Sequence, residues 1–302
     1  MEPRPRATQL AVRLLRFLPA LPFTILSHRL LHGDWRTFRD PHTYTERLQA
    51  KKLYDHDPRY PITADKYAVR AWVAERIGAE YLVPLLADVT DDFMKVDWDS
   101  LPNSFVVKAT NGSNRNVLIN EKSQHTQREI AEQTALWRRK SHYRLFKEWA
   151  YRSIPPRIIV EEHLGHGGPP PPDVKFFVMN GRAKLVQFDS DRFGDHRREM
   201  YDRDGRLLDV TIDIDPRSDV PPEPPKNWTD LRDIAEKLGA EFEFVRIDLY
   251  SRDGAVFFGE ITHYPGGAAP LFTPRDFDAV FGDIWGHGGE IPSRYYAQPA
   301  LS

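Results

Sequence analysis

The stretch FVRIDLYSRDGAVFFGEITHYPGG, residues 244–267, has the pattern of two β-strands joined by a tight turn. Polar and apolar residues alternate in both halves, as expected where successive side chains point to opposite faces of a strand. Between the halves, Asp253-Gly254 is a strong signal for a hairpin turn because glycine accepts a positive φ. The sequence therefore predicts a hairpin with a glycine-rich exit at 266–267.

The polar face of this hairpin carries groups suited to a metal-bound polyphosphate. Arg246 and Asp248 share a face of the first strand, and Glu260 and Thr262 share a face of the second strand with Phe258. A cation beside two carboxylates can neutralise phosphate oxygens and hold Mg²⁺, which prefers oxygen ligands. An ATP-using enzyme is the first hypothesis that follows.

The expected register comes from a three-residue loop, 252–254. It places Asp248 opposite Phe258 and Arg246 opposite Glu260, so the two carboxylates become diagonal neighbours with Cα atoms about 7–8 Å apart. Carboxylates at that spacing can share a divalent cation. A half-exposed hairpin with an ordinary cross-strand Arg-Glu pair has the same pattern, so alternation alone leaves both interpretations open.

Composition bounds the class of protein. The chain has 302 residues, 40% of them hydrophobic, which suits one multi-lobed domain or two domains with a sizeable core. A net charge of −2 gives no polycationic signature for nucleic acid. The absence of cysteine excludes disulfides, thiolate zinc sites and cysteine nucleophiles, and fits a cytoplasmic location.

Residues 10–31 are apolar and basic. Arg13 and Arg16 interrupt the apolar run and Pro19 and Pro22 break it, so it is a poor transmembrane span, and it lacks a small-residue cleavage site. A helix packed on the domain is the favoured interpretation. A peripheral contact with the anionic inner face of a membrane is the alternative.

Strands and helices are mixed along the chain, and its hairpins indicate antiparallel sheets, so α+β is the predicted class. Helices are expected over 63–77 with Thr63 as N-cap, over 126–151, over 229–238, and near Phe277. Strands are expected at 103–110, 117–119, 157–162, 174–179, 182–188 and in the opening hairpin.

Three further segments carry candidate ligands for a nucleotide. Lys108 ends a strand and precedes the loop 111–116, whose backbone amides could cradle phosphate, although the loop is no Walker A motif. The strand end at 161–164 could present backbone groups to an adenine edge. Lys175 lies inside an apolar strand, where an unpaired lysine is rare, so a phosphate partner is reasonable. An ordinary polar loop, a solvated strand end and an edge strand remain the respective alternatives.

Asp189-Ser190-Asp191 resembles the Asp-x-Asp motif of metal-dependent glycosyltransferases. It follows a hairpin strand rather than an N-terminal nucleotide-binding unit, so this role is disfavoured. Arg192, the next residue, could grip a carboxylate or phosphate through its planar guanidinium. Hydrolase and zinc-protease patterns such as GxSxG and HExxH are absent from the sequence.

In this order, the segments resemble the TupA-like family of the ATP-grasp superfamily, which is associated with bacterial capsule and surface-polysaccharide genes. The resemblance covers roughly residues 36–285. It rests on TYTERLQAKKLYD at 43–55, TADKYAVRAWVAERIG at 63–78, LPNSFVVKATNGS at 101–113, PPRIIVEEHL at 155–164, DVKFFVMNGRAKLVQFDSDR at 173–192 and the opening stretch at 244–267.

The resemblance implies an ATP-grasp fold in which two α+β lobes clamp ATP. It divides the chain into a helical, membrane-proximal segment at 1–60, a lobe with the phosphate loop at 61–164, and a lobe with the metal site at 165–302. It also implies the roles of the site residues, with Arg192 kept as a further candidate for gripping an anion. Lys108 and Lys175 would contact the phosphates, under a loop that contains Gly112 and Ser113. The adenine hinge would consist of Glu161, Glu162 and Leu164. Mg²⁺ would be held by Asp248, Glu260 and Thr262, and Arg246 would neutralise the transferred phosphoryl group.

The usual reaction of the superfamily joins a carboxylate to an amine through an acyl-phosphate and converts ATP to ADP and phosphate. The family association points to a uronic acid or amino acid on a surface glycan as the carboxylate. A kinase acting on a hydroxyl, a glycosyltransferase using Asp189 and Asp191, and a nucleotide-binding regulator are the alternatives. Retention of Lys108, Asp248 and Glu260 argues against the regulator.

Overall fold

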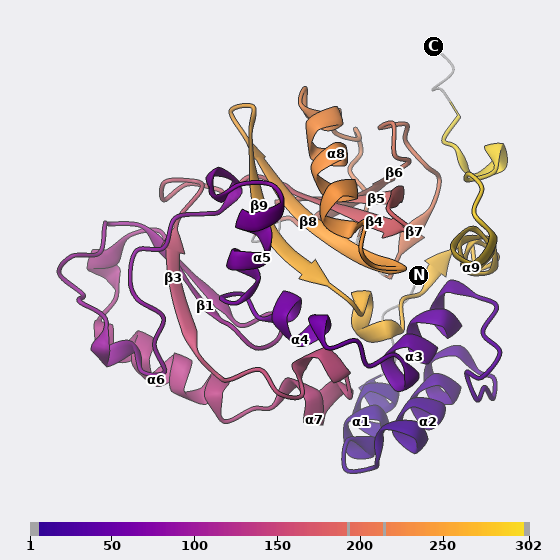
Figure 1. Ribbon diagram of the computed structural model, residues 1–302, viewed down its shortest axis with the longest axis horizontal. Helices are drawn as coiled ribbons and strands as arrows, with labels where there is room; N and C mark the ends of the chain where they lie inside the picture. Colours follow the sequence, from indigo (N-terminus) through magenta and orange to yellow (C-terminus); the bar gives the residue numbers. More distant parts are fainter. Residues whose placement is uncertain (1–5, 192–193, 214–215, 299–302) are drawn as a thin grey trace.

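Two antiparallel sheets from successive parts of the chain form the frame of the molecule (Figure 1). The computed structural model describes residues 6–191, 194–213 and 216–298. Helices cover the outer faces of the sheets, and a cleft lined by residues of both sheets lies between them. This arrangement confirms the predicted α+β class.

The smaller sheet has the strand order β2-β1-β3. Its strands are β1 (Phe105–Ala109), β2 (Asn116–Ile119) and β3 (Ile158–Glu162), close to the segments expected from the sequence. Val107 and Val160 on one face pack into a core with Ile130 of helix α6 (Gln127–Arg138). Lys108 and Glu161 lie on the opposite face, because neighbouring residues of a strand alternate between faces.

The larger sheet has the order β6-β5-β4-β8-β9. Helix α8 (Trp228–Gly239) packs on one face, where the ring of Trp228 lies 5.6 Å from that of Phe176. A Cβ at Gly239 would lie 2.6 Å from Cγ1 of Val178, so glycine is what lets this helix approach the sheet. The strands are β4 (Asp173–Met179), β5 (Arg182–Ser190), β6 (Arg197–Tyr201), β8 (Phe244–Arg252) and β9 (Ala255–Thr262).

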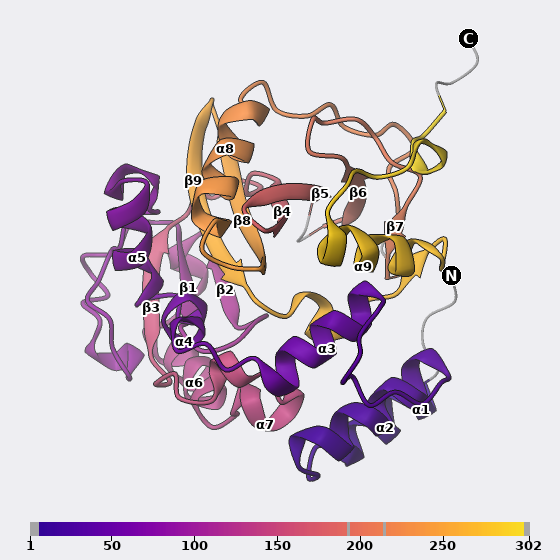
Figure 2. The ribbon, with the colours of Figure 1, turned by 45° about the vertical axis from the view of Figure 1, so that its right-hand side comes forward.

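Helices from the two ends of the chain meet beside the larger sheet (Figure 2). Helix α3 (Tyr44–Tyr54) packs on α9 (Phe277–His287), and the fully buried ring of Tyr44 lies 4.8 Å from Phe281 and 5.4 Å from Phe244. A capping box between Thr43 and Glu46 fixes the start of α3. The N-terminal part of the chain is thereby joined to the core of the larger sheet.

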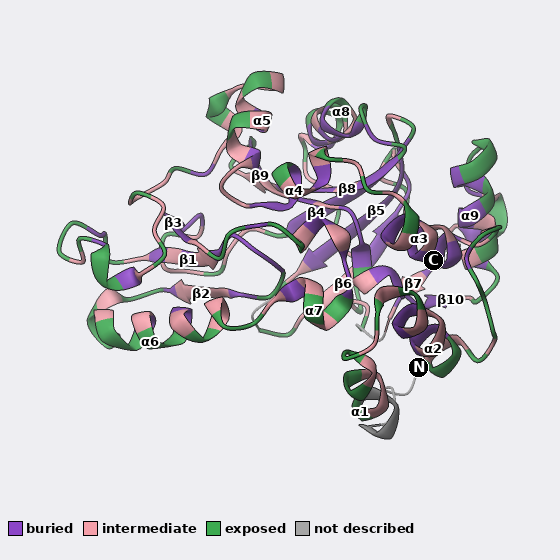
Figure 3. Cartoon of the chain, turned by 60° about the horizontal axis from the view of Figure 1, so that its bottom comes forward, coloured by how far each residue is buried: buried purple, intermediate pink, exposed green. Residues whose placement is uncertain are grey.

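The first two helices differ in burial (Figure 3). Helix α2 (Ala20–His32) buries Phe23 and Ser27, whereas α1 (Arg6–Leu15) exposes Leu10 and Leu14. Within the described ranges, none of the helices is long and apolar enough to cross a membrane. The remaining elements are α4 (Arg59–Ala64), α5 (Val69–Arg76), α7 (His142–Phe146), β7 (Thr211–Ile212), β10 (Phe272–Thr273) and several short 3-10 helices.

Two predicted helices are wrong in their extent. The expected helix 63–77 is split after Ala64, and Thr63 lies inside α4, where its hydroxyl shares a hydrogen bond of 2.8 Å with Nε2 of His263. Asp65 interrupts the helix because its carboxylate accepts the backbone N–H of Tyr67. The expected helix 126–151 is likewise divided into α6, α7 and a 3-10 turn, with Ser141 capping α7.

Candidate nucleotide and metal site

The β8–β9 hairpin differs from the expected register in a way that brings the two carboxylates together. Its turn has two residues, Asp253 and Gly254, both with positive φ, rather than three. Gly259 forms a bulge, so Asp248 lies directly opposite Glu260 instead of diagonal to it. The bulge also reverses the alternation of β9, which moves Glu260 to the face opposite that of the buried Phe258.

Polar residues form a continuous row across the cleft face of the larger sheet. The backbone register places Glu260 of β9 beside Asp248 of β8, Asp248 beside Lys175 of β4, and Lys175 beside Gln187 of β5. Because these residues are cross-strand neighbours, their side chains emerge on the same face. Two hairpins that are distant in the sequence, β4–β5 and β8–β9, thus bring two carboxylates, an ammonium group and an amide to one line.

Arg246 is a cation that lies beside all three predicted metal ligands. Its guanidinium donates to both carboxylate oxygens of Asp248, at 2.7 Å each, and to Oγ1 of Thr262 at 3.2 Å. Glu260 lies 3.6 Å away. Burial opposes the charge of Arg246, but Asp248 and Glu260 outweigh it and raise the pKa of the guanidinium.

Asp248 remains poorly compensated despite this partner. Burial raises the pKa of Asp248 to about 6, against the lowering effect of Arg246, and the charge of Glu260 adds to the rise. A divalent cation between Asp248 and Glu260 would relieve both causes, so the pair fits Mg²⁺. No group of three or more His, Asp and Glu side chains is arranged as a metal site in the part of the chain that the structure describes.

Lys175 is held by carboxylates at the floor of the cleft. It pairs with Asp189 and, at 3.2 Å, with Asp173, while Arg198 and Gln187 also donate to Asp189. Burial opposes ionisation of Asp189, but the neighbouring His196, Lys175 and Arg198 hold the pKa of this carboxyl well below its usual range. Asp189 is therefore a charged partner of cations.

The two aspartates of the Asp-x-Asp motif have different partners. Whereas Asp189 is bound by buried cations, the carboxylate of Asp191 accepts the backbone N–H of Asp195 at 2.7 Å and stabilises the turn that follows β5. The contact of Asp191 is thus a local side-chain-to-backbone interaction within a turn. Arg192, which the sequence analysis proposed as an anion ligand, lies outside the described residues.

Across the cleft, Lys108 and Lys66 frame the predicted phosphate loop. Lys108 pairs with Glu161 at 2.6 Å, and Arg70 holds the other oxygen of that carboxylate at 3.1 Å. Lys66 donates to the carbonyl of Gly112 at 3.0 Å and to Glu260 at 3.1 Å. Lys66 thus links the loop to the carboxylate pair of the other sheet.

Sequence reasoning missed Lys66, although it lies in the stretch 63–78 quoted above. Nothing in its sequence neighbourhood marks it, because the two groups it contacts come from positions 112 and 260. Gly112 itself has a φ of 111°, and a Cβ there would lie 2.9 Å from Nδ1 of His142. The loop therefore requires glycine at this position.

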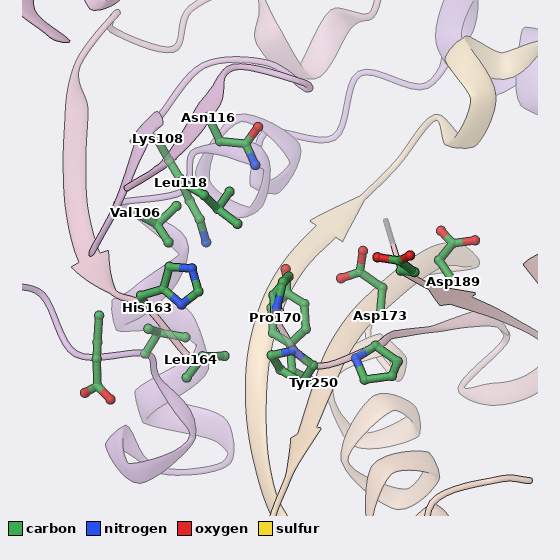
Figure 4. Close-up of a pocket in the computed structure, with 15 residues that line it drawn as sticks. Val106, Lys108, Asn116, Leu118, His163, Leu164, Pro170, Asp173, Asp189 and Tyr250 are labelled. Atoms are coloured by element: carbon green, nitrogen blue, oxygen red, sulfur yellow. The ribbon is translucent and has the colours of Figure 1, made fainter. Parts of the chain in front are cut away.

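An apolar pocket opens where the two sheets approach each other (Figure 4). Lys108 stands at its edge between the small sheet and Tyr250 of the large one. Of the residues predicted to form the adenine hinge, Glu162 and Leu164 line this pocket, whereas Glu161 faces Lys66, Arg70 and Lys108 in a neighbouring hollow. The apolar lining comes from Val83, Val106, Leu118, Leu164 and the prolines at 170–172.

Beyond this pocket lies a larger cleft, whose volume is about 2020 Å³ including the part open to solvent. It runs past Ser113, Lys175, Arg246 and Glu260 to side chains of α2 and α3. An apolar slot that can take a flat base, followed by lysines and then a carboxylate pair, gives the order of groups in a nucleoside triphosphate with its metal.

Several solved structures are similar to the chain at low sequence identity. No curated protein matches the chain. Among solved structures, it is similar to the D-alanine–D-alanine ligase from Bacillus anthracis complexed with ATP (13% identity, TM-score 0.39, 68% of this chain and 56% of that one). It is also similar to the D-alanine–D-alanine ligase from Helicobacter pylori (12%, 0.41, 73% and 59%) and to the D-cycloserine synthetase DcsG (13%, 0.43, 74% and 69%). The chain spans less than two thirds of the length of the two D-alanine ligases.

A family model covers most of the chain. The model described as TupA-like ATPgrasp matches residues 46–285, a range that includes both sheets, Lys66, and the Asp248–Glu260 pair. This match confirms the resemblance found in the sequence, and the chain therefore belongs to the TupA-like ATP-grasp family.

Proposed function

We propose that this protein is an ATP-dependent ligase that joins a carboxylate to an amine. The observation that carries the proposal is the direct opposition of Asp248 and Glu260 beside Arg246, on a sheet face that leads to an apolar pocket. Carboxylates for a metal next to fixed cations can stabilise a phosphoryl group during transfer. Membership of the family supports the same reaction class.

In this proposal the base of ATP lies in the pocket formed with Leu164 and Glu162. Lys108 and Lys175 neutralise the phosphates, and the loop with Gly112 and Ser113 covers them. The raised pKa of Asp248 supports a metal at this end, since burial leaves its charge in need of a cation. The residues that would hold Mg²⁺ are Asp248 and Glu260, with Thr262 as a third candidate, and the bound ion would neutralise phosphate charge.

The chemistry needs positioning rather than a side-chain nucleophile. A carboxylate oxygen of the substrate attacks the γ-phosphorus of ATP, and the bond between this phosphorus and the oxygen that bridges it to the β-phosphate breaks. The products of this step are an acyl-phosphate and ADP. An amine then attacks the carbonyl carbon, loses a proton, and expels inorganic phosphate. Arg246, held by Asp248 at 2.7 Å, is placed to stabilise the charge of the transferred group.

A surface glycan or its lipid-linked precursor is the proposed source of the carboxylate. Helix α1 and the turn after it expose large apolar side chains next to exposed Arg13 and Arg16, a combination that binds the surface of an anionic membrane. Sedimentation with phosphatidylglycerol vesicles, but not with phosphatidylcholine vesicles, would support this placement. The exposed apolar residues are Leu10 and Leu14 of α1 and Phe17 of the turn, and Leu21 at the start of α2 continues this surface.

The reaction is tested by measuring ADP release from ATP and Mg²⁺ with panels of uronic acids and amino acids. We expect release that requires both a carboxylate and an amine, with an amide as the product. A stable phosphorylated product formed without an amine would identify a kinase instead. Binding of UDP-sugars with Mg²⁺ and no binding of ATP would overturn the ligase and favour a glycosyltransferase.

A further inference from the structure

The helical end of the cleft contains a buried lysine that the nucleotide site does not use. Lys52 of α3 is only 4% exposed, yet it lines the cleft together with Gln49, one turn earlier on the same helix, and Phe23 of α2. These residues lie between the N-terminal helices and the turn at 264–267. They are at the opposite end of the cleft from the apolar pocket.

Within the described ranges, Lys52 has no hydrogen bond and no ion pair. The carboxylate that acts on it electrostatically is Glu148, which shares a hydrogen bond of 2.9 Å with Nε2 of His142. Burial lowers the pKa of Lys52 to about 8, and Glu148 only partly offsets this effect. Lysine is rarely buried unless it is paired, so the ammonium is poised for an anion from outside the chain.

The side chains around Lys52 are also polar and unsatisfied. No described residue supplies a partner for Oε1 of Gln49 or for Oγ of Ser27, although both side chains are more than nine-tenths buried. The ring of Phe23 lies 5.8 Å from the ammonium of Lys52 and 5.8 Å from that of Lys147. Two ammonium groups thus lie near one aromatic ring, in a part of the cleft that is also lined by an amide and a hydroxyl whose oxygens lack partners among the described residues.

Tyr151 connects this region to the metal end of the cleft. Burial raises the pKa of its phenol, the charges of Glu148 and Glu260 raise it further, and Arg246 lowers it. Tyr151 also lines the cleft. Because Lys52, Tyr151 and Glu260 line the same cleft, a single substrate that fills this part of the cleft can contact both Glu260 and Lys52.

We propose that Lys52, Gln49 and Ser27 form an anion-binding subsite for a second carboxylate, or a phosphate, on the molecule whose first carboxylate is activated beside Glu260. Lys52 would pair with the anion, while the amide and hydroxyl would bind neighbouring polar groups. The inference rests on the proposed function, because it assigns the reacting carboxylate to the metal end. It restricts the substrate to compounds with a second negative charge.

The test compares three sugar acids on protein saturated with Mg²⁺ and the non-hydrolysable analogue AMP-PNP, which keeps the phosphate sites filled. D-Glucuronate carries one carboxylate, D-glucarate carries two, and D-glucuronate 1-phosphate carries a carboxylate and a phosphate. Titration calorimetry measures each affinity for the wild type, for Lys52→Met, and for the control Lys95→Met, which removes an exposed charge on the other lobe.

We expect the wild type to bind one of the doubly charged compounds at least tenfold more tightly than D-glucuronate. Lys52→Met should abolish that preference and Lys95→Met should keep it, and the favoured compound shows whether the second group is a carboxylate or a phosphate. Equal affinities in the wild type, or an undiminished preference in Lys52→Met, would overturn the subsite. Failure of AMP-PNP to bind with Mg²⁺ would instead contradict the proposed ATP site, and the sugar-acid comparison remains measurable without it.

Discussion

Asp248 lies directly across from Glu260 because Gly259 is accommodated as an extra residue in β9. The two carboxylates differ in what else they do. Asp248 is almost fully buried and is the bidentate partner of Arg246, whereas the side chain of Glu260 is 27% exposed and pairs with Lys66. This difference decides which variant tests the metal site cleanly.

Glu260→Gln should reduce Mg²⁺-dependent ADP formation by at least about 100-fold, because it removes the charge of a proposed metal ligand. Its melting temperature should stay near that of the wild type, because the side chain is partly exposed. Asp248→Asn should also lose activity, but it additionally removes the bidentate partner of Arg246 and so perturbs more than the metal site. ADP release and thermal melts measure both effects. Wild-type turnover in Glu260→Gln would refute the metal assignment.

Gly259→Ala tests whether the bulge positions Glu260. A Cβ at this residue would lie 2.9 Å from the backbone oxygen of Asp248 and 3.1 Å from Cε2 of Tyr250, so the strand has to move. We expect a loss of about 1–3 kcal/mol in unfolding free energy together with weaker Mg²⁺ dependence of ADP formation. Gly254→Asn is the control, since asparagine suits a positive φ in the turn and nothing lies within 4 Å. A fully active Gly259→Ala variant would show that the bulge has no part in the site.

Lys66→Met should raise the KM for ATP about tenfold, which corresponds to about 1.4 kcal/mol. The reason is that Lys66 holds the carbonyl of Gly112 and the carboxylate of Glu260 at once. Steady-state kinetics with ATP as the varied substrate measure the change. Lys95→Met again provides the control, and equal KM values for the two variants would contradict the role of Lys66.

Lys52→Met should be more stable than the wild type at pH 7 in the absence of substrate. The pKa of Lys52 is lowered to about 8 in the folded protein from 10.5 in the unfolded chain, so burial of its charge costs about 3 kcal/mol below pH 8. The folded state binds fewer protons at this site, so the wild type regains that stability as the pH rises from 8 to 10.5.

Denaturant unfolding of both proteins at pH 7, 8, 9 and 10 measures this effect. The stability difference between Lys52→Met and the wild type should be largest at pH 7 and shrink above pH 8. A difference that stays constant over this range would mean that Lys52 is not a buried charge.

Local sequence determined most of the strands and the polar face of β8. The alternation of Arg246 and Asp248 with apolar neighbours, and the turn signal at 253–254, required only the period of a strand and the freedom of glycine. The apolar strand that contains Lys175 could likewise be predicted from the sequence. These features depend on interactions between residues that are close in the chain.

Tertiary structure alone decided the register of β9, the position of Lys66 and the surroundings of Lys52. The bulge at Gly259 is favoured by packing of Phe258 and Ile261 into the core, which local alternation does not reveal. Lys66 and Lys52 acquire their surroundings from segments far away in the sequence, and no local pattern encodes such contacts. The sequence by itself therefore determined which residue types the cleft carries, and folding decided which of them meet.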